Sequence, residues 1–269
     1  MTSTLDPRFL STAVEAALLG GRVQLRYFRQ NPEIQKKGPI DLVTEADLEV
    51  EREFRALIAS RFPGHEVLGE EGSQASDGSS GLPRWIVDPI DGTTNFAHGL
   101  ALFCISIALE IEGRVEVGVV YDPVGQELFT AERGGGARLN GLPIRATTGE
   151  TLIDALLCTG FPYSIQTDRK SQVDVFAAFL GRARAVRRLG SAALDLCYVA
   201  AGRFDGFWED QLHAWDIAAG ALIAEEAGAT ISDYLGQPVD LGRGQIVAVS
   251  AGLHAEVLEV IGATQTDTP

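Results

Sequence analysis

Hydrophobic residues near the start of the chain recur every three or four positions, which is the spacing of an amphipathic α-helix. The pattern covers residues 7–29, and Asn31-Pro32 would end that helix. A second helix is predicted between Asp41-Leu42-Val43-Thr44 and Phe62-Pro63-Gly64. The apolar positions that share a face are Leu10, Val14, Ala17, Leu18, Gly21, Leu25 and Phe28 in the first helix, and Val50, Phe54, Leu57 and Ile58 in the second. Both helices are therefore expected to lie with one face against a core.

The middle of the chain has the pattern of antiparallel β-strands. Residues 65–69 are predicted as a short strand. Residues 102–111, 115–121 and 127–131 are predicted as three antiparallel strands, because β-branched residues are frequent there and Gly or Pro bound each run. Gly134-Gly135-Gly136 lacks a following Lys-Ser/Thr, so it indicates a turn rather than a phosphate-binding loop. Asn140-Gly141 is typical of a two-residue hairpin.

From about residue 147 the chain alternates between strands and helices. Strands are predicted at 155–158, 183–189, 204–209, 230–232 and 246–250, and helices at 168–180, 191–201, 215–227 and 253–261. This alternation predicts a sheet covered by helices on both faces, and the chain as a whole is assigned to the α/β class. We therefore divide it into an α+β domain (1–146), an α/β domain that completes the site (147–262) and a flexible tail (263–269).

The composition is that of a soluble globular protein, with 45% hydrophobic and 22% charged residues in a chain of 269. The net charge of −15 argues against nucleic acid and anionic membranes as partners. No apolar run reaches ~18 residues and no signal peptide is recognised, so we expect a cytoplasmic protein. Cys104, Cys158 and Cys197 are widely spaced within apolar runs, which fits a reducing compartment.

Residues 85–96 carry the most informative chemistry. They read WIVDPIDGTTNF, so three apolar residues lead into Asp88 and Asp91, with Pro89 between them. Proline stiffens this turn, and we expect neither aspartate to belong to a regular strand. Two carboxylates this close repel each other unless a cation lies between them, and Mg²⁺ prefers such ligands together with a backbone carbonyl, here that of Ile90. The alternative is a plain turn in which Asp91 caps a helix.

Gly92-Thr93-Thr94 follows directly and is expected to open a helix. The amides of Gly92 and Thr93 would then point away from a helix N-terminus, where a phosphate can bind. A metal site and a phosphate site would therefore adjoin each other. An acidic protein can act on an anionic substrate if bound divalent cations reverse the local field.

Other acidic residues stand at the ends of predicted elements. Glu70-Glu71 follows the strand at 65–69, Asp47 lies on the apolar face at the start of the second helix, and Asp216 opens the helix at 215–227. A carboxylate that points inward needs a partner, so each is a candidate for the site. The structural alternatives are a solvated loop end for Glu70, and helix capping for Asp47 and Asp216.

Three further segments are candidates for substrate contact. Gly190-Ser191-Ala192-Ala193 opens a predicted helix, whose free amides would face either the hydroxyls of a substrate or water. Lys36 belongs to a predicted exposed turn at 36–39. Arg187, with Arg188, would either meet a second phosphate or lie at a solvated strand end.

Together these segments resemble the inositol monophosphatase family, the Mg²⁺-dependent and lithium-sensitive phosphatases. The resemblance extends over nearly the whole chain, and the central stretch with the Trp-Asp motif carries most of its specificity. The matching segments are DLVTEAD at 41–47, GEE at 69–71, WIVDPIDGTTNF at 85–96, GSAA at 190–193 and WDIAAG at 215–220. The resemblance implies a layered αβαβα sandwich that forms a homodimer.

The resemblance also implies a site with two or three Mg²⁺ ions that lithium inhibits. Its metal ligands would be Glu70, Asp88, the carbonyl oxygen of Ile90, Asp91 and Asp216. The hydroxyl of Thr93, oriented by Asp47, would help Glu70 to activate the attacking water. Two cations ~3.5–4 Å apart can generate hydroxide and neutralise the leaving alkoxide, so no covalent intermediate is expected.

The substrate would lie against residues from both halves of the chain, namely Asp91, Gly92, Thr93, Gly190, Ser191, Ala192, Glu209 and Asp216. Glu209 would accept hydrogen bonds from hydroxyls of the leaving group, which favours a small polyol phosphate, with myo-inositol 1-phosphate as first choice. The same carboxylate could bind an amine, which keeps histidinol phosphate open. The shared metal motif also allows fructose 1,6-bisphosphate or a nucleotide phosphate. A regulatory binding protein that retains the fold is the alternative from another class.

Overall fold

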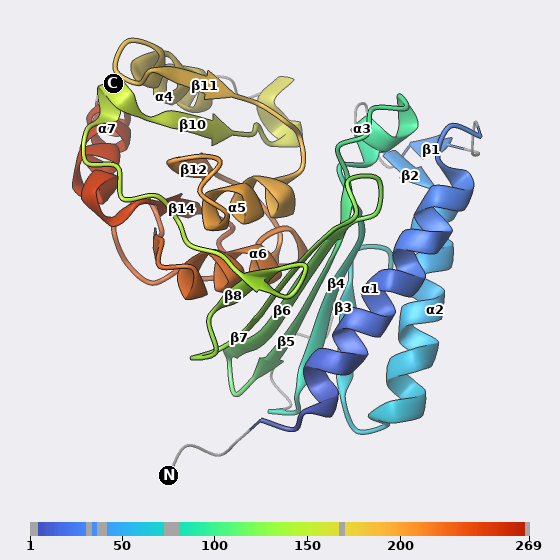
Figure 1. Cartoon of the computed structure of the whole chain (residues 1–269). Helices are drawn as coiled ribbons and strands as arrows, with labels where there is room; N and C mark the ends of the chain where they lie inside the picture. Colours follow the sequence, from blue (N-terminus) through green and yellow to red (C-terminus); the bar gives the residue numbers. More distant parts are fainter. Residues whose placement is uncertain (1–4, 31–33, 37–41, 73–80, 167–169, 267–269) are drawn as a thin grey trace.

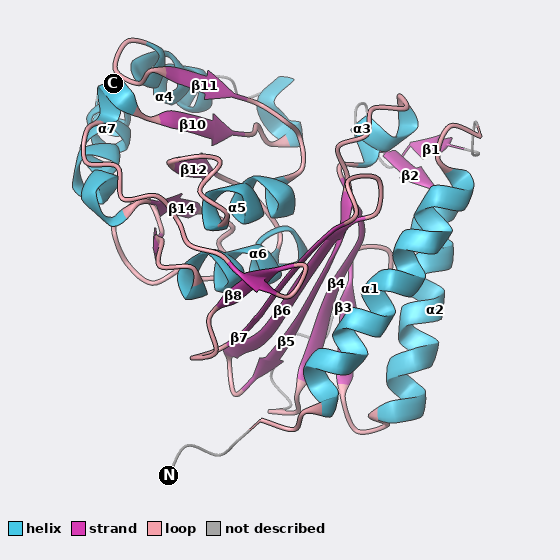
Figure 2. Cartoon of the chain, in the orientation of Figure 1, coloured by secondary structure: helices cyan, strands magenta, loops and turns pink. Residues whose placement is uncertain are grey.

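The computed structural model describes residues 5–30, 34–36, 42–72, 81–166 and 170–266. Its main elements stack in five layers: helices, a seven-stranded sheet, helices, a five-stranded sheet and helices again (Figure 1; Figure 2). The layered αβαβα sandwich expected from the resemblance is therefore confirmed.

Helices α1 (Arg8–Tyr27) and α2 (Glu45–Arg61) form the outer layer on the larger sheet, close to the two predicted ranges. The buried face of α1 consists mainly of small residues, because this helix lies close to the sheet. A Cβ added at Gly20 would come within 2.5 Å of Ile105 Cδ1, whereas Leu18 and Leu25 stay 38% and 44% exposed. The predicted apolar face of the first helix was wrong at these two leucines.

The larger sheet is antiparallel except at one edge. Its strands, in spatial order, are β3 (Glu66–Gly69), β4 (Arg84–Asp91), β5 (Cys104–Ile111), β6 (Arg114–Asp122), β7 (Glu127–Glu132), β8 (Ala137–Leu139) and β9 (Leu142–Pro143). β3 and β4 are parallel, and the antiparallel pairing of β5, β6 and β7 confirms the prediction. Asn140 and Gly141 join β8 to β9 with φ of 51° and 80°, as a two-residue hairpin requires.

The smaller sheet belongs to the second part of the chain. Its strands, in spatial order, are β11 (Ala185–Arg187), β10 (Leu156–Thr159), β12 (Gly206–Glu209), β14 (Ile246–Val249) and β13 (Thr230–Ser232). Helices α4 (Lys170–Leu180) and α7 (His254–Thr266) cover its outer face (Figure 1). The predicted tail is helical as far as Thr266, because buried Val260 and Ile261 anchor the last turns of α7 in the core.

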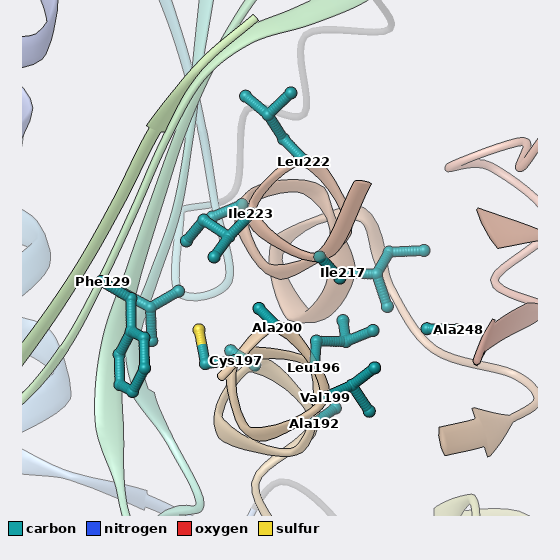
Figure 3. Close-up of a cluster of buried hydrophobic side chains, with 14 of the residues drawn as sticks. Phe129, Ala192, Leu196, Cys197, Val199, Ala200, Ile217, Leu222, Ile223 and Ala248 are labelled. Carbon is teal, nitrogen blue, oxygen red and sulfur yellow. The ribbon is translucent and has the colours of Figure 1, made fainter. Parts of the chain in front are cut away.

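Helices α5 (Ala192–Ala200) and α6 (Ala214–Glu226) fill the layer between the two sheets. Figure 3 shows Phe129 reaching this layer from the larger sheet and Ala248 from the smaller one. A Cβ added at Gly118 of β6 would lie 2.8 Å from the carbonyl oxygen of Ala219, so the backbones of β6 and α6 nearly touch. One apolar cluster includes residues of both sheets and both helices, and the division at residue 147 stays a prediction.

Several short elements had no signal in the sequence, because two to four residues are too few to show a period. They are the antiparallel pair β1 (Ile34–Lys36) and β2 (Leu42–Thr44), and the 3₁₀ turns Leu152–Asp154, Tyr163–Gln166 and Ala251–Leu253. Lys36 lies in β1 instead of a turn, and residues 37–39 of that predicted turn are outside the described residues.

The cysteines fit the prediction that the chain has no disulfide framework. Cys104, Cys158 and Cys197 are free and buried. Burial raises the pKa of the Cys104 and Cys197 thiols well above the ordinary value, so both are protonated at neutral pH. Separately, none of the helices in the described ranges is both long and apolar enough to cross a membrane.

Gly118→Ala is expected to lower the free energy of unfolding by about 1–3 kcal/mol. The new Cβ would clash with the backbone of α6, which cannot move away as a flexible side chain could. The measurement is the midpoint of urea-induced unfolding, monitored by tryptophan fluorescence. Gly64→Ala is the control, since a Cβ there meets nothing within 4 Å and its φ is not left-handed. Equal midpoints for the two variants would contradict the close approach of β6 and α6.

Candidate active site

Asp88 and Asp91 lie at the C-terminal end of β4, where the pairing with β5 is irregular. Asp88 is opposite Ser106 and Asp91 opposite Cys104, so the register shifts between the two aspartates. We expected neither aspartate to belong to a regular strand. Both lie in β4, which continues to Asp91, and only the pairing between them is irregular, so the expectation was wrong in part. Pro89 lacks the N–H of a regular ladder, and a bulge accommodates it.

Gly92 turns the chain out of β4 with φ of 97° and opens α3 (Thr93–Ala97), the predicted helix, which is only one turn long. A side chain at Gly92 would collide with backbone, because its Cβ would lie 2.9 Å from the carbonyl oxygen of Leu102. The Thr93 hydroxyl donates to the carbonyl oxygen of Ile90 at 2.9 Å. The bulge, Gly92 and Thr93 thus form one rigid turn.

The buried Asp88 and Asp91 and the half-buried Asp216 lie together at this turn, with two more acids nearby. Burial raises the pKa of Asp88 well above the ordinary value, and the charges of Glu70, Asp91, Asp216 and Asp47 raise it further. Burial likewise raises the pKa of Asp91 to about 6 and that of Asp216 well above its usual range. The structure thus brings together the acidic residues selected from the sequence.

One oxygen of each buried aspartate is held by the protein. Asp88 Oδ1 accepts the Ile90 amide at 2.9 Å, and Asp216 Oδ2 accepts the His213 amide at 2.7 Å in a capping box. Asp91 Oδ2 accepts the Ser191 hydroxyl at 2.7 Å. A donor set made only of oxygen suits a hard cation such as Mg²⁺. As these side chains stand, no group of three or more His, Cys, Asp or Glu residues within the described ranges is arranged to hold a metal, and the ligand set stays a prediction.

Asp47 acts as a capping residue, which was one of its two interpretations. Its Oδ2 accepts the amide and the hydroxyl of Thr44 at 2.7 and 2.6 Å, in a capping box at the start of α2. Its Oδ1 is buried without a hydrogen-bond partner, and Thr93 donates to Ile90 instead of to Asp47. Burial raises the pKa of Asp47 to about 7.

A cavity of ≈ 120 Å³ opens beside the buried aspartates, between the two halves of the chain. All eight residues expected to face a substrate line it, from Asp91 in the first half to Asp216 in the second. The sequence interpretation missed Gly160, which lines the same cavity and has no periodic or motif signal. Arg188 also lines it, and the sequence had named this residue only together with Arg187.

Glu209, the last residue of β12, lines the cavity. Burial raises the pKa of Glu209 well above its ordinary value, and the charges of Asp195 and Asp216 raise it further. A Cβ added at Gly160 would overlap the Glu209 carboxylate, so Gly160 provides the space in which this carboxylate lies. Glu209 is therefore a desolvated acid held against backbone.

The basic candidates are rearranged in the structure. Arg187 ends β11, exposed, with its guanidinium donating to the carbonyl oxygen of Val186 at 3.2 Å. Its neighbour Arg188 lines the cavity instead, and within the described ranges no hydrogen bond or ion pair of its side chain is formed. Lys36 ends β1, and its side chain is outside the described part of the structure.

Asn95 is a structural link that the sequence interpretation did not single out, although it belongs to the central motif. Its side-chain Nδ2 donates to the carbonyl oxygens of Leu102 and Leu189, at 2.8 and 2.9 Å. Leu102 lies just before β5 of the larger sheet, and Leu189 lies just before the start of α5. Asn95 therefore fastens the loop before α5 to the turn that carries Asp91.

The sequence model of the Inositol monophosphatase family matches residues 6–265. The chain belongs to this family. Membership confirms the prediction that the protein is an enzyme of the phosphoric monoester hydrolase class, and it accounts for the position of the motifs around one cavity.

Similar proteins are named either inositol-1-monophosphatase or Nus factor SuhB. The inositol-1-monophosphatase of Rhizobium meliloti (strain 1021) is 43% identical over 254 residues, which cover 94% of this chain and 95% of the relative. The Nus factor SuhB of Pseudomonas aeruginosa is 43% identical over 262 residues, with 94% and 95% covered. The solved inositol monophosphatase from Anabaena (Nostoc) sp. PCC 7120 is 37% identical, with a TM-score of 0.87 over 95% of this chain and 96% of that one.

Asp195, in α5 of this inositol monophosphatase family member, is a buried acid that the sequence interpretation also missed. It is 1% exposed, and neither carboxylate oxygen has a hydrogen-bond partner. Burial raises its pKa well above the ordinary value, and the negative charge of Asp91 adds to this effect. A lone acid within the apolar run ALDLCYVA was the available signal.

Asp195→Asn is expected to stabilise the metal-free protein, and to do so more at about pH 8 than at about pH 5. The folded state retains a proton that unfolded Asp195 loses above about pH 4, so native stability falls as the pH rises through that window. Asparagine stays neutral and removes this dependence.

The measurement is the Tm in EDTA across this pH range. Asp174→Asn is the control, because Asp174 is exposed on α4. A gain of equal size at every pH would contradict the assignment of the effect to the Asp195 charge.

Proposed function

We propose that the protein hydrolyses a small polyol phosphate with the help of Mg²⁺, and that myo-inositol 1-phosphate is the first-choice substrate. The observation that supports this most directly is the cluster of desolvated aspartates beside a cavity that Glu209 also lines. The name of the Rhizobium relative points to the same substrate. The active form would be a cytoplasmic homodimer.

Divalent cations fit the chemistry of the buried carboxylates, because like charges desolvated together need a counter-charge. The residues that would hold two or three ions are Glu70, Asp88, the carbonyl oxygen of Ile90, Asp91 and Asp216. Bound Mg²⁺ would supply an activated water and neutralise charge on the leaving oxygen. Each aspartate has one oxygen outside its hydrogen bonds to the amides and hydroxyl described above, and Asp88 and Asp216 share a side-chain hydrogen bond that a cation would replace.

The phosphate would lie at the turn into α3, against the amides of Gly92 and Thr93. The left-handed φ of Gly92 and its lack of a side chain leave this backbone open to the cavity. Glu70 would take the proton of the attacking water, and Glu51 fixes the segment after β3 by accepting the amide of Glu71 at 2.8 Å. Thr93 would orient that water. Its hydroxyl would then leave the carbonyl oxygen of Ile90 and donate to Oδ1 of Asp47, which has no hydrogen-bond partner.

The leaving group would occupy the part of the cavity between Gly160, Ala192 and Glu209. A desolvated carboxyl group there gains from hydroxyl donors, which a polyol supplies in several directions. Arg188 adds a guanidinium that forms no ion pair within the described ranges. This positive charge would tolerate an anionic substituent on the leaving group. Phosphate transfer and leaving-group choice would thus involve separate residues.

Turnover is expected to require a divalent cation, because the buried aspartates would otherwise repel the substrate phosphate. Exhaustive treatment with EDTA should abolish phosphate release, and added Mg²⁺ should restore it. Asp88→Asn should lower kcat by at least about 100-fold, with Asp174→Asn as the matched exposed control. Lithium in the millimolar range is expected to inhibit. Full activity after chelation would contradict this prediction.

Glu209→Ala should lower kcat/KM for myo-inositol 1-phosphate by about one to two decades, since it removes roughly 1.5–3 kcal/mol of hydrogen bonding to the leaving group. Glu209→Gln should lose less, because burial raises the Glu209 pKa and a neutral amide resembles the protonated acid. With p-nitrophenyl phosphate, which has no hydroxyls on its leaving group, both variants should match the wild type. Equal losses on the two substrates would show that Glu209 supports the fold or the metal site.

A regulatory binding role is the second candidate, because a relative of equal identity is named Nus factor SuhB. The deciding experiment is a phosphate-release screen with Mg²⁺ over inositol 1-phosphate, histidinol phosphate, fructose 1,6-bisphosphate and nucleotide phosphates. Release from one class would identify the substrate. No release from any of them would favour the binding role.

A further inference from the structure

Asp91 is held by hydrogen bonds that come from the opposite half of the chain. Its Oδ2 accepts the Ser191 hydroxyl at 2.7 Å and the Ala193 amide at 2.6 Å, both at the start of α5. The Cys104 thiol lies 3.8 Å from the same oxygen. Asp91 and Ser191 are 100 positions apart in sequence, so this contact exists only in the folded chain.

These bonds replace an ordinary helix cap. Ser191 is the N-cap residue of α5, yet its side chain accepts no hydrogen bond from the helix. It donates to Asp91, and the Ala193 amide, which an N-cap side chain normally accepts, also goes to Asp91. Asp91 therefore caps α5 from another part of the chain.

This arrangement leaves one oxygen of Asp91 for a ligand. Ser191 is 1% exposed and Asp91 8% exposed, so water does not replace the bonds to Oδ2. Asp91 lines the cavity, and the hydrogen bonds from Ser191 and Ala193 both go to its Oδ2. The Ser191 hydroxyl thus fixes which oxygen of the carboxylate is free and in which direction it faces.

The loop that presents Ser191 is itself fastened to the Asp91 turn. Gly190 has a φ of 86°, and Asn95 holds the carbonyl oxygen of Leu189 at 2.9 Å. A Cβ added at Gly92 would lie 3.3 Å from the Gly190 carbonyl oxygen, so the two turns are in direct contact. Ser191 is therefore placed with little freedom to turn toward a substrate.

We propose that Ser191 is a positioning residue for the cation site, which acts through Asp91 and does not bind the leaving group. This inference rests on the proposed metal-dependent function, and it revises the substrate contact that the family resemblance implied for Ser191. It also means that a helix of the second half orients a metal ligand of the first.

The main test is Mg²⁺ affinity, measured by isothermal titration calorimetry without substrate. Ser191→Ala should weaken Mg²⁺ binding by about 10-fold or more, as removal of a residue that orients a metal ligand does. Ser191→Thr keeps the hydroxyl and should bind Mg²⁺ as the wild type does. Ser250→Ala is the control, because Ser250 is also buried and donates only to the Gly149 carbonyl oxygen, at 2.8 Å. An unchanged affinity in Ser191→Ala would overturn the proposal.

Kinetics separate the two roles of Ser191. At saturating Mg²⁺, Ser191→Ala should regain kcat within about threefold of the wild type and keep its KM for inositol 1-phosphate. A raised KM at every Mg²⁺ concentration, with unchanged Mg²⁺ affinity, would show that the hydroxyl contacts the leaving group. Should Ser191→Ala fail to fold, Ser191→Cys offers a weaker donor of similar size for the same titration.

A double-mutant cycle in EDTA tests the contact without any metal or turnover. Asp91→Ala and Ser191→Ala each remove one partner of this hydrogen bond and should be coupled, so that the change in Tm of the double variant differs from the sum of the single changes. Additive losses would overturn the contact. A wild type that binds Mg²⁺ but releases no phosphate from any substrate would refute the proposed function and leave this inference standing.

Discussion

The structure depends on keeping several buried carboxylates of like charge in one place. Asp88, Asp91 and Asp216 are desolvated together, and each raises the cost of ionising the others. Hydrogen bonds from backbone amides and from Ser191 offset part of this cost and fix one oxygen of each carboxylate. The oxygens that stay outside these bonds define where a cation would be favoured. A site of this kind is stable only if the surrounding elements hold it rigidly.

The layered architecture supplies that rigidity. Two of the aspartates come from β4, whereas Asp216 and the donors to Asp91 come from the helices of the middle layer. Helix α6 lies close to the larger sheet because small residues allow backbone contact, as between Gly118 of β6 and Ala219. Larger side chains at such positions would move α6 away from the sheet, and Asp216 with it.

In the proposed function, the residues that would bind the phosphate differ from those that would bind the leaving group. Asp91 and the turn at Gly92 come from the first half of the chain, and Glu209 and Arg188 come from the second half. Glu209 occupies its place because Gly160 has no side chain. Changes at Gly160, Arg188 or Glu209 can therefore alter the leaving group that fits without touching the acids that would hold the metal.

The sequence by itself determined most of the helices and strands, because periodicity and turn residues are local properties, as at the Asn140-Gly141 hairpin. It also determined the acidic residues and the family, because motifs such as WIVDPIDGTTNF are contiguous. Only the tertiary structure decided that β4 continues through a bulge to Asp91, that Ser191 turns toward Asp91, and that Arg188 instead of Arg187 enters the cavity. These outcomes depend on contacts between residues that are distant in sequence, 100 positions in the case of Asp91 and Ser191, and no local pattern records which groups meet when the chain folds.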